Sequence, residues 1–438
     1  MKSFFKSKKI AVVGASRDRD KVGNVIYRNL LRSRRKIFAV NSKADKVEGN
    51  KAYNDVLSIP FSVDLAIIVV PAKAVPGVLK ECGEKDIERA IIVSAGFEEA
   101  GNEERGRKVE TISKKYDMEI IGPNVLGIIN PYQNINASFF RDMPKKGNVA
   151  FISQSGAVGT SLLDRALETG TGISGFVSLG NMQDQDFIDA LEYFGSDIRT
   201  EVIVMYIESL RKETGRKFVD LCRNISKDKK IVAIKAGKSE VGEKAEATHT
   251  ASLSSPAEIY AGAFKQAGID EVESLDELFN VARIYSKYGQ LGKNAGIITN
   301  AGGLGVLASD AFSKNDIDVS SLSGEVLNQL DQKMPEGYSR NNPLDILGDA
   351  LAERYGKALK ILEMYDIYDF YTVIVSPQEM TQPLKTAKLL ANKGKPVFPC
   401  FVGGQSFKKA KEFLTEEGVI YFEDVAEAGR VLGKAIRS

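Results

Sequence analysis

Residues 147–164 read GNVAFISQSGAVGTSLLD, an apolar run that ends in a turn of Ser, Gln and Gly before an amphipathic stretch begins. The same order recurs along the chain in KIAVVGAS, LAIIVVPA, AIIVSAG, EVIVMYIES, KIVAIKAG, AGIITNAGG, YTVIVSPQ and PVFPCFVGG. Continuously apolar strands that alternate with helices are typical of parallel sheets covered on both faces. We therefore predict an α/β protein of doubly wound parallel sheets, with its chemistry in the turns at the carboxyl ends of the strands.

Two stretches interrupt this pattern. Residues 130–148 contain two prolines and no clear periodicity, and residues 285–294 are polar and contain glycine. At roughly 150 residues per domain, a chain of 438 residues has room for about three domains. We predict domains at residues 1–130, 145–285 and 291–438.

The second and third predicted domains begin with related sequences. Residues 147–164 align without gaps with KNAGIITNAGGLGVLASD at 293–310, sharing Asn148/Asn294, Ile152/Ile298, Gly156/Gly302, Gly159/Gly305 and Asp164/Asp310. The last two shared glycines fit a purely structural role, in which they let a strand and a helix pack closely. That role does not explain why hydroxyls and an amide crowd the first turn. Free N–H groups and the helix dipole favour anions there, so we predict a cradle for an anion such as phosphate at Ser153, Gln154, Ser155 and Gly156.

Charge and cysteine content exclude several function classes. The chain has 60 Lys+Arg and 58 Asp+Glu, a net charge of +2, and this balance creates no field for nucleic acid or an anionic membrane. Its three cysteines lie far apart without a CxxC pair, which indicates neither a disulfide framework nor zinc. No apolar run reaches about 18 residues. We predict a soluble cytoplasmic protein with no metal site of its own and no nucleic-acid or membrane partner.

The first turn, VVGASRDRDKVGN at residues 12–24, begins like a dinucleotide-binding unit but lacks the GxGxxG pattern. The next strand, KIFAVNSKAD at residues 36–45, ends in Lys43 where an NAD-binding fold usually has a carboxylate. A lysine suits a ribose that carries a phosphate. Coenzyme A fits that requirement, and an NADP-dependent oxidoreductase is the alternative.

The chain has one histidine, His249, in the loop sequence EATHTAS at residues 246–252. Glu208 directly follows the apolar strand in MYIESL at residues 205–210. Either residue by itself fits an ordinary surface position. In a doubly wound fold, however, the loops after neighbouring strands share one rim. We therefore expect His249, Glu208 and the SQSG turn to converge.

Ten motifs in this order resemble the α subunit of NDP-forming acyl-CoA synthetases, a family that includes ADP-forming acetate–CoA ligase and, more distantly, succinyl-CoA synthetase. They are VVGASRDRDKVGN, VVPAKAV, IIVSAGF, IGPNVLGIINP, ISQSGAVGTS, GNMQDQDFIDALEYF, IKAGKSE, HTASL, ITNAGGLGVLASD and NPLDILGD. The acetate type is more similar, because the shorter succinate-type α subunit lacks the third domain. The resemblance implies a Rossmann-like CoA-binding domain followed by two flavodoxin-like domains.

The resemblance also implies an activity: acyl-CoA, phosphate and ADP react reversibly to acid, ATP and CoA. By motif position His249 takes the phosphoryl group from an acyl phosphate, and Glu208 is the carboxylate that orients it. Both roles suit the residues, since a neutral imidazole is nucleophilic near pH 7 and a carboxylate partner fixes its tautomer. One departure is Ser209, where relatives often have glycine.

Substrate contacts are carried over by motif only. For CoA they are Gly14, Ser16, Lys21, Lys43, Pro71, Ala72, Ser94, Gly96 and Asn124. Asn181 joins the SQSG turn at the phosphate or acyl site. A core or turn role is the alternative for Pro71 and Gly96.

The nucleotide half of the reaction has no counterpart in the sequence. There is no GxxxxGK[ST] phosphate loop and no acidic pair assignable to magnesium. We therefore expect an ATP-grasp β subunit to hold Mg-ADP or Mg-ATP, in an α2β2 assembly that uses a small organic acid. The alternative is a CoA-binding regulatory paralogue without turnover.

Overall fold

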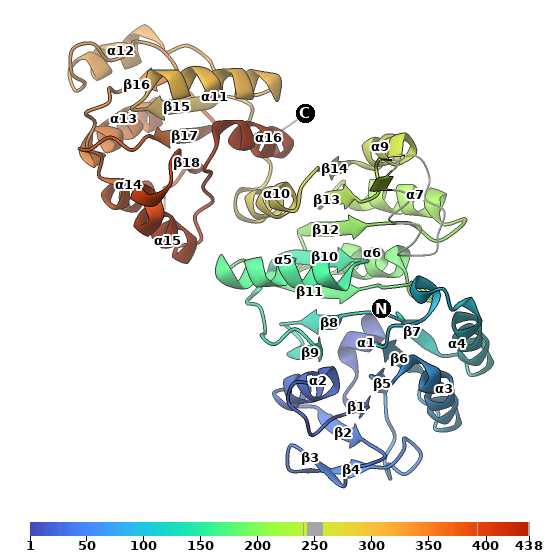
Figure 1. Cartoon of the computed structure of the whole chain (residues 1–438). Helices are drawn as coiled ribbons and strands as arrows, with labels where there is room; N and C mark the ends of the chain where they lie inside the picture. Colours follow the sequence, from blue (N-terminus) through green and yellow to red (C-terminus); the bar gives the residue numbers. More distant parts are fainter. Residues whose placement is uncertain (240, 243–256, 392, 437–438) are drawn as a thin grey trace. The chain divides into compact units, whose positions relative to one another are not determined.

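The computed structural model describes residues 1–239, 241–242, 257–391 and 393–436. The chain divides into two compact units, which we call unit 1 (Met1–Leu167 and Gly172–Leu275) and unit 2 (Glu168–Thr171 and Asp276–Ser438). Among the described residues, unit 1 holds two seven-stranded sheets and unit 2 holds one four-stranded sheet (Figure 1).

The first sheet of unit 1 has the strand order β3-β4-β2-β1-β5-β6-β7 and is parallel except for the β3–β4 hairpin. Its strands are β1 (Lys9–Val13), β2 (Lys36–Val40), β3 (Lys46–Val47), β4 (Asn50–Tyr53), β5 (Leu65–Ile68), β6 (Arg89–Ile92) and β7 (Glu119–Ile121). Helix α1 (Lys2–Lys6) precedes the first strand, and the helical segments between the strands are α2 (Val22–Leu31), η1 (Ala72–Ala74), α3 (Val75–Glu84), η2 (Glu98–Ala100) and α4 (Glu103–Lys115). Helices α1 and α2 pack into one core cluster, and α3 and α4 into another. The sheet is therefore buried on both faces, as its unbroken apolar strands predict.

The second sheet of unit 1 has the order β14-β13-β12-β10-β11-β8-β9. Its strands are β8 (Gly127–Asn130), β9 (Ile135–Ser138), β10 (Lys146–Ser153), β11 (Ile173–Ser178), β12 (Val202–Ile207), β13 (Lys230–Lys235) and β14 (Ile269–Glu271). Its helices are α5 (Gly156–Glu168), α6 (Phe187–Ser196), α7 (Gly215–Ile225) and α9 (Ala257–Ala267). The strands from β10 to β14 are parallel, whereas β8 pairs antiparallel with both β11 and β9.

The β8–β9 hairpin occupies residues that the sequence analysis divided between the first domain and a linker at 130–148. Each of its strands has four residues, all of them buried. Strands of only four residues that include buried polar side chains, such as Asn130 in β8 and Asn136 and Ser138 in β9, do not form the apolar runs by which the other strands were recognised. The hairpin extends the second sheet toward the first one.

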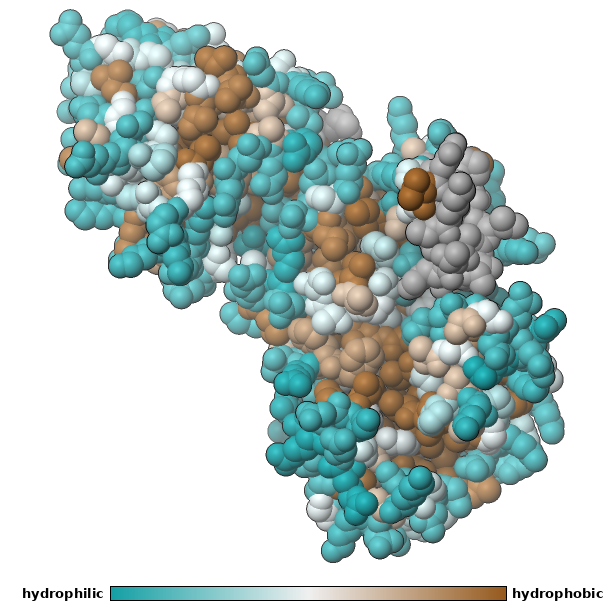
Figure 2. Space-filling model, viewed as in Figure 1, coloured by the Kyte–Doolittle hydropathy of each residue, from teal (hydrophilic) through white to brown (hydrophobic). Residues whose placement is uncertain are grey.

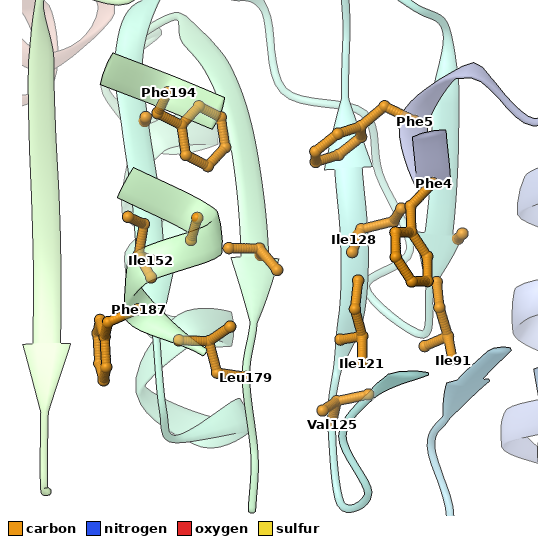
Figure 3. Packing of buried hydrophobic residues seen from close by; sticks show 14 of the residues in the cluster. Phe4, Phe5, Ile91, Ile121, Val125, Ile128, Ile152, Leu179, Phe187 and Phe194 are labelled. Carbon is orange, nitrogen blue, oxygen red and sulfur yellow. The ribbon is translucent and has the colours of Figure 1, made fainter. Parts of the chain in front are cut away.

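One hydrophobic core runs through both sheets of unit 1. Phe4 and Phe5 of α1 are fully buried in it, and Figure 3 shows them beside the strand that carries Ile128. The Phe5 ring stacks on Tyr193 of α6, with 4.9 Å between ring centroids. The first two predicted domains therefore form one packed body.

Unit 2 repeats the strand–turn–helix pattern of the second sheet. Its sheet is parallel, in the order β16-β15-β17-β18, and comprises β15 (Ala295–Thr299), β16 (Leu344–Asp345), β17 (Phe370–Val375) and β18 (Val397–Phe401). Its helical segments are α10 (Leu275–Tyr288), α11 (Gly302–Lys314), α12 (Gly324–Asp331), α13 (Ala352–Met364), α14 (Pro383–Leu390), η3 (Gln405–Phe407), α15 (Lys408–Glu416) and α16 (Val425–Ala435). A Cβ added to Gly159 would lie 2.6 Å from Phe176, and one added to Gly305 would lie 3.2 Å from Pro343. These two aligned glycines therefore have the packing role considered above.

The predicted α/β class with parallel sheets is confirmed. Seen from one side, the surface of each unit carries many hydrophilic side chains, and hydrophobic patches lie among these side chains (Figure 2). No helix in the described ranges has the length and hydrophobicity that a membrane crossing requires. The cytoplasmic location stays a prediction.

Candidate active site

A cavity of about 160 Å³ lies in unit 1 where the loops after four strands meet. Its lining residues are Asn124, Gln154, Gly180, Asn181, Met182, Glu208, Ser209, Leu210, Arg211 and Lys212. Asn124 belongs to the loop after β7 of the first sheet, and the others follow β10, β11 and β12 of the second. The cavity thus lies at the carboxyl ends of parallel strands, where such folds bind ligands.

Four residues expected at the site line this cavity together: Asn124, Gln154, Asn181 and Glu208. They are far apart in the sequence, and the two sheets of unit 1 bring them to one place. Ser153, Ser155 and Gly156 lie next to the cavity, outside its lining. His249 lies outside the described residues, so its pairing with Glu208 stays a prediction.

Gln154 holds the turn that carries Glu208. Its side-chain oxygen accepts hydrogen bonds from the backbone N–H groups of Glu208 (2.9 Å) and Ser209 (3.0 Å). Its amide nitrogen donates to the Ser209 hydroxyl at 3.2 Å. Both ends of the buried Gln154 amide are thus engaged within the protein. Gln154 therefore positions Glu208. The hydroxyl of Ser209, which a glycine at this position would lack, supplies one of the contacts.

The turn at the start of α5 has its own internal bonds. The Ser153 hydroxyl donates to the backbone oxygen of Ser155 at 2.6 Å, and Ser153 is fully buried. The Ser155 hydroxyl accepts from the N–H of Val158 at 3.4 Å. Helix α5 begins at Gly156, which is partly exposed. The positive end of the helix dipole is therefore the part of this turn that is open to an anion.

The loop at 121–124 is joined to the loop at 180–183. The N–H of Asn181 donates to the backbone oxygen of Pro123 at 3.0 Å, and that of Gln183 to Gly122 at 3.0 Å. Gly180 has a φ of +56°, and an added Cβ would lie 2.2 Å from the Pro123 oxygen. Only glycine fits this close approach. These contacts fix Asn124 against Asn181 at the cavity wall.

The residues expected to bind CoA follow five neighbouring parallel strands of the first sheet. Gly14, Ser16 and Lys21 come after β1, Lys43 after β2, Pro71 and Ala72 after β5, Ser94 and Gly96 after β6, and Asn124 after β7. Lys21 and Lys43 are exposed, and Lys21 is the residue just before α2. The rim formed by these turns runs from Lys43 to Asn124 and so ends at the cavity.

Some of these polar groups are already used inside the protein. The Ser94 hydroxyl donates to the backbone oxygen of Val70 at 2.5 Å. The Ser16 hydroxyl accepts from the N–H of Asp18 at 3.0 Å. These serine hydroxyls therefore shape their turns, while Lys21 and Lys43 are exposed on the same rim.

Sequence reasoning missed two cations of the site, Arg211 and Lys212. Both line the cavity, three and four residues after Glu208. Arg211 donates to the backbone oxygen of Asp184 at 2.6 Å and pairs with Asp186 at 3.5 Å. Burial raises the pKa of the Asp186 carboxyl. The available signal was the basic pair that begins three residues after the strand-end carboxylate, in ESLRK.

Comparison with known proteins agrees with this architecture. Three domain families match the chain in order: a CoA binding domain at residues 8–131, a succinyl-CoA ligase like flavodoxin domain at 146–285 and a ligase-CoA domain at 295–437. The chain is 39% identical over 443 residues to the alpha subunit of ADP-forming acetate–CoA ligase II of Pyrococcus furiosus, covering 98% of this chain and 96% of that subunit.

Other relatives are longer. ADP-forming acetate–CoA ligase I of Archaeoglobus fulgidus is 41% identical over 436 residues, and the match covers 99% of this chain but 63% of that enzyme. The structure resembles the acetyl-coenzyme A synthetase 1 of Candidatus Korarchaeum cryptofilum, which was solved with phosphate and ADP. The TM-score is 0.91 at 35% identity, over 99% of this chain and 96% of that one. The chain therefore belongs to the ADP-forming acetate–CoA ligase family and matches an alpha subunit of that family over almost the full length of both chains.

Proposed function

We propose that the chain is the α subunit of an ADP-forming acyl-CoA synthetase of the acetate–CoA ligase type. The observation that carries this proposal is the cavity at which Asn124, from the predicted CoA-binding rim, meets Gln154, Asn181 and Glu208 of the second sheet. A thioester held along that rim ends beside the carboxylate that is expected to orient His249. The proposed assembly converts acyl-CoA, phosphate and ADP reversibly into acid, ATP and CoA.

The first sheet offers groups that suit each part of CoA. The N-terminus of α2 follows Gly14 and Ser16, and its N–H groups attract the pyrophosphate. Lys43, exposed after β2, suits the 3′-phosphate by a charge-assisted hydrogen bond. The turns at Pro71 and Gly96 lie between these groups and the cavity in strand order. This arrangement supports a CoA arm that runs along the rim with its sulfur at Asn124.

The second sheet offers the groups for phosphate. When phosphate attacks the acyl carbon, CoA leaves as a thiolate and an acyl phosphate forms. Arg211 and Lys212 supply positive charge at the cavity, and the start of α5 adds a partial one. His249 then takes the phosphoryl group, which releases the acid as a carboxylate, and passes the group to ADP. The cavity of about 160 Å³ is smaller than pockets for drug-sized ligands, at roughly 300–1,000 Å³, which favours a small acid such as acetate.

The nucleotide half of the reaction belongs to a partner in this proposal. The alpha subunit named among the relatives implies a second subunit. We propose that this is an ATP-grasp β subunit which binds Mg-ADP, in an α2β2 assembly.

The test is co-expression with a candidate ATP-grasp subunit, followed by measurement of acid-dependent CoA thioester and ADP formation over a panel of acids. We expect turnover with a short acid and none with the His249→Asn variant, whose CoA affinity should be unchanged. Because the chain has one histidine, no other imidazole can replace it. Phosphorylation of the chain by acetyl phosphate distinguishes the enzyme subunit from the regulatory alternative. A regulatory paralogue would bind CoA without becoming phosphorylated.

A further inference from the structure

Two carboxylates outside the cavity lining hold the Asn181 side chain in one orientation. Asn181 Nδ2 donates to Glu99 Oε2 at 2.7 Å and to Glu98 Oε2 at 3.0 Å. Asn181 Oδ1 lies on the other side, 3.5 Å from Nδ2 of Asn124. Ionised carboxylates only accept hydrogen bonds, so a flipped amide would place its oxygen against two acceptors. The side chain therefore presents its oxygen to Asn124 and the cavity wall.

Glu99 is itself firmly held. Its Oε1 accepts from the backbone N–H of Gly96 at 2.5 Å and of Phe97 at 3.2 Å. Burial by itself would raise the pKa of Glu99, but the hydrogen bonds from Asn181 and from these two N–H groups outweigh burial and lower the pKa. Glu99 is therefore ionised near neutral pH. It joins the turn after β6 of the first sheet to the loop after β11 of the second.

We infer that Glu98 and Glu99 are positioning residues that present Asn181 Oδ1 as a hydrogen-bond acceptor to the thiol end of CoA. This inference rests on the proposed function. The pantetheine arm of CoA carries N–H and S–H donors, whereas phosphate near neutral pH offers mainly acceptor oxygens. A hydrogen-bond acceptor at the cavity wall therefore favours the donor groups of CoA over the negatively charged acceptor oxygens of phosphate. Asn181 thus serves CoA, although the sequence motif groups it with the phosphate site.

Glu98→Gln is the most direct test, because it alters one contact of the Asn181 amide and leaves the Gly96 and Phe97 bonds of Glu99 intact. CoA affinity of the full chain is measured by calorimetry, beside Glu99→Gln and the control Glu104→Gln. Glu104 lies on α4, exposed, in an ion pair with Lys108. A glutamine amide can donate as well as accept, so neither test variant forces the Asn181 amide into one orientation as two carboxylates do. We expect CoA affinity to fall roughly tenfold in both, about the effect of one charge-assisted hydrogen bond, and to stay unchanged in the control.

A double-mutant cycle separates orientation of Asn181 from general stability. If Glu98 acts through Asn181, then Glu98→Gln should weaken CoA binding in the wild type and have no further effect in the Asn181→Ala background. Equal losses in both backgrounds would mean a merely structural carboxylate and would overturn the inference. If the Glu99→Gln variant does not fold, the double-mutant cycle of Glu98 and Asn181 by itself tests the inference.

The KM for phosphate in the assembled enzyme is the second readout. It should change less than twofold in Glu98→Gln, while the KM for CoA rises. A rise in the KM for phosphate at constant CoA affinity would also overturn the inference and return Asn181 to the phosphate site. The calorimetric test needs only this chain and CoA. If the assembled enzyme does not turn over, the proposed function is rejected. The calorimetric CoA affinities of the variants can still be interpreted.

Discussion

At the scale of single residues, the site depends on a carboxylate and the amide that holds it. Glu208 directly follows β12 and is 8% exposed, and its backbone N–H donates to the Gln154 side chain. A side chain that accepts from two successive N–H groups restricts the direction of the turn. Substitution of either residue should therefore slow the same step, by different factors.

Glu208→Gln should leave CoA binding intact and still allow slow acyl phosphate formation, but it should slow phosphorylation of His249 by on the order of 10²–10⁴-fold. The substitution keeps the size of the side chain and removes the charge that steadies the imidazolium. Rapid-quench measurement of phosphohistidine on this chain, with acetyl phosphate as donor, reports the step. Labelling within about threefold of wild type would return Glu208 to the role of a solvated strand end.

Gln154→Ala should slow the same step by about 10- to 100-fold, because a small misplacement of a catalytic group has effects of that size. It also leaves the N–H groups of Glu208 and Ser209 without their acceptor, which costs about 1–3 kcal/mol of stability each if they stay dry. Ser209→Gly is the matched control, since it removes the hydroxyl that accepts from Gln154 at 3.2 Å and keeps both backbone N–H groups that donate to Gln154. If both variants label His249 at the wild-type rate, Gln154 does not position Glu208.

At the scale of elements, the short helix α1 and the β8–β9 hairpin make unit 1 a single body. Five residues of α1 place Phe4 and Phe5 in the core that both sheets share. An isolated helix of this length is unstable in water, so packing rather than helix propensity holds it in place. The cavity depends on this packing, because its walls come from both sheets.

Phe5→Ala should destabilise unit 1 by about 3–5 kcal/mol, as is typical when a buried aromatic ring is removed from a packed core. The stacking partner Tyr193 also loses its contact. The change in the free energy of unfolding is measured by chemical denaturation, followed by fluorescence in the presence of CoA, or by calorimetry. Leu57→Ala, at a side chain that is 47% exposed, is the control and should stay within about 0.5 kcal/mol of wild type. A small effect of Phe5→Ala would mean that α1 is dispensable.

At the scale of the whole molecule, the candidate site lies entirely within unit 1. All the residues expected to contact CoA, and the cavity itself, belong to Met1–Leu167 or Gly172–Leu275. Unit 2 has its own core around a separate parallel sheet. Binding of CoA and assembly with a partner can therefore be tested separately.

A fragment of residues 1–275 should fold and bind CoA within about threefold of the full chain, measured by calorimetry. Its circular dichroism spectrum shows whether it is folded before the titration is interpreted. A folded fragment that does not bind CoA would place an essential contact in unit 2. The same fragment is not expected to support ADP-forming turnover.

The sequence by itself determined the fold class and the neighbourhood of the site. Unbroken apolar strands such as β10 and β12 can be stable only when both faces of the sheet are covered, so they specified a parallel α/β fold. The rule that ligands bind at the carboxyl ends of such strands then indicated Gln154 and Glu208, and the family resemblance added Asn124. All three line one cavity. The family, too, was recognisable from the order of the motifs.

Only the tertiary structure decided what each side chain does. Gln154 bonds a residue 55 positions away, and Asn181 bonds a carboxylate 82 positions away. Hydrogen-bond partners at such separations are set by how the strands are ordered in space, which local sequence pattern does not encode. The β8–β9 hairpin was not recognised either, because its strands are four residues long and contain buried polar residues such as Asn136 and Ser138. Periodicity reports which faces are buried, while the pairing of polar groups depends on which loops the packed sheets bring together.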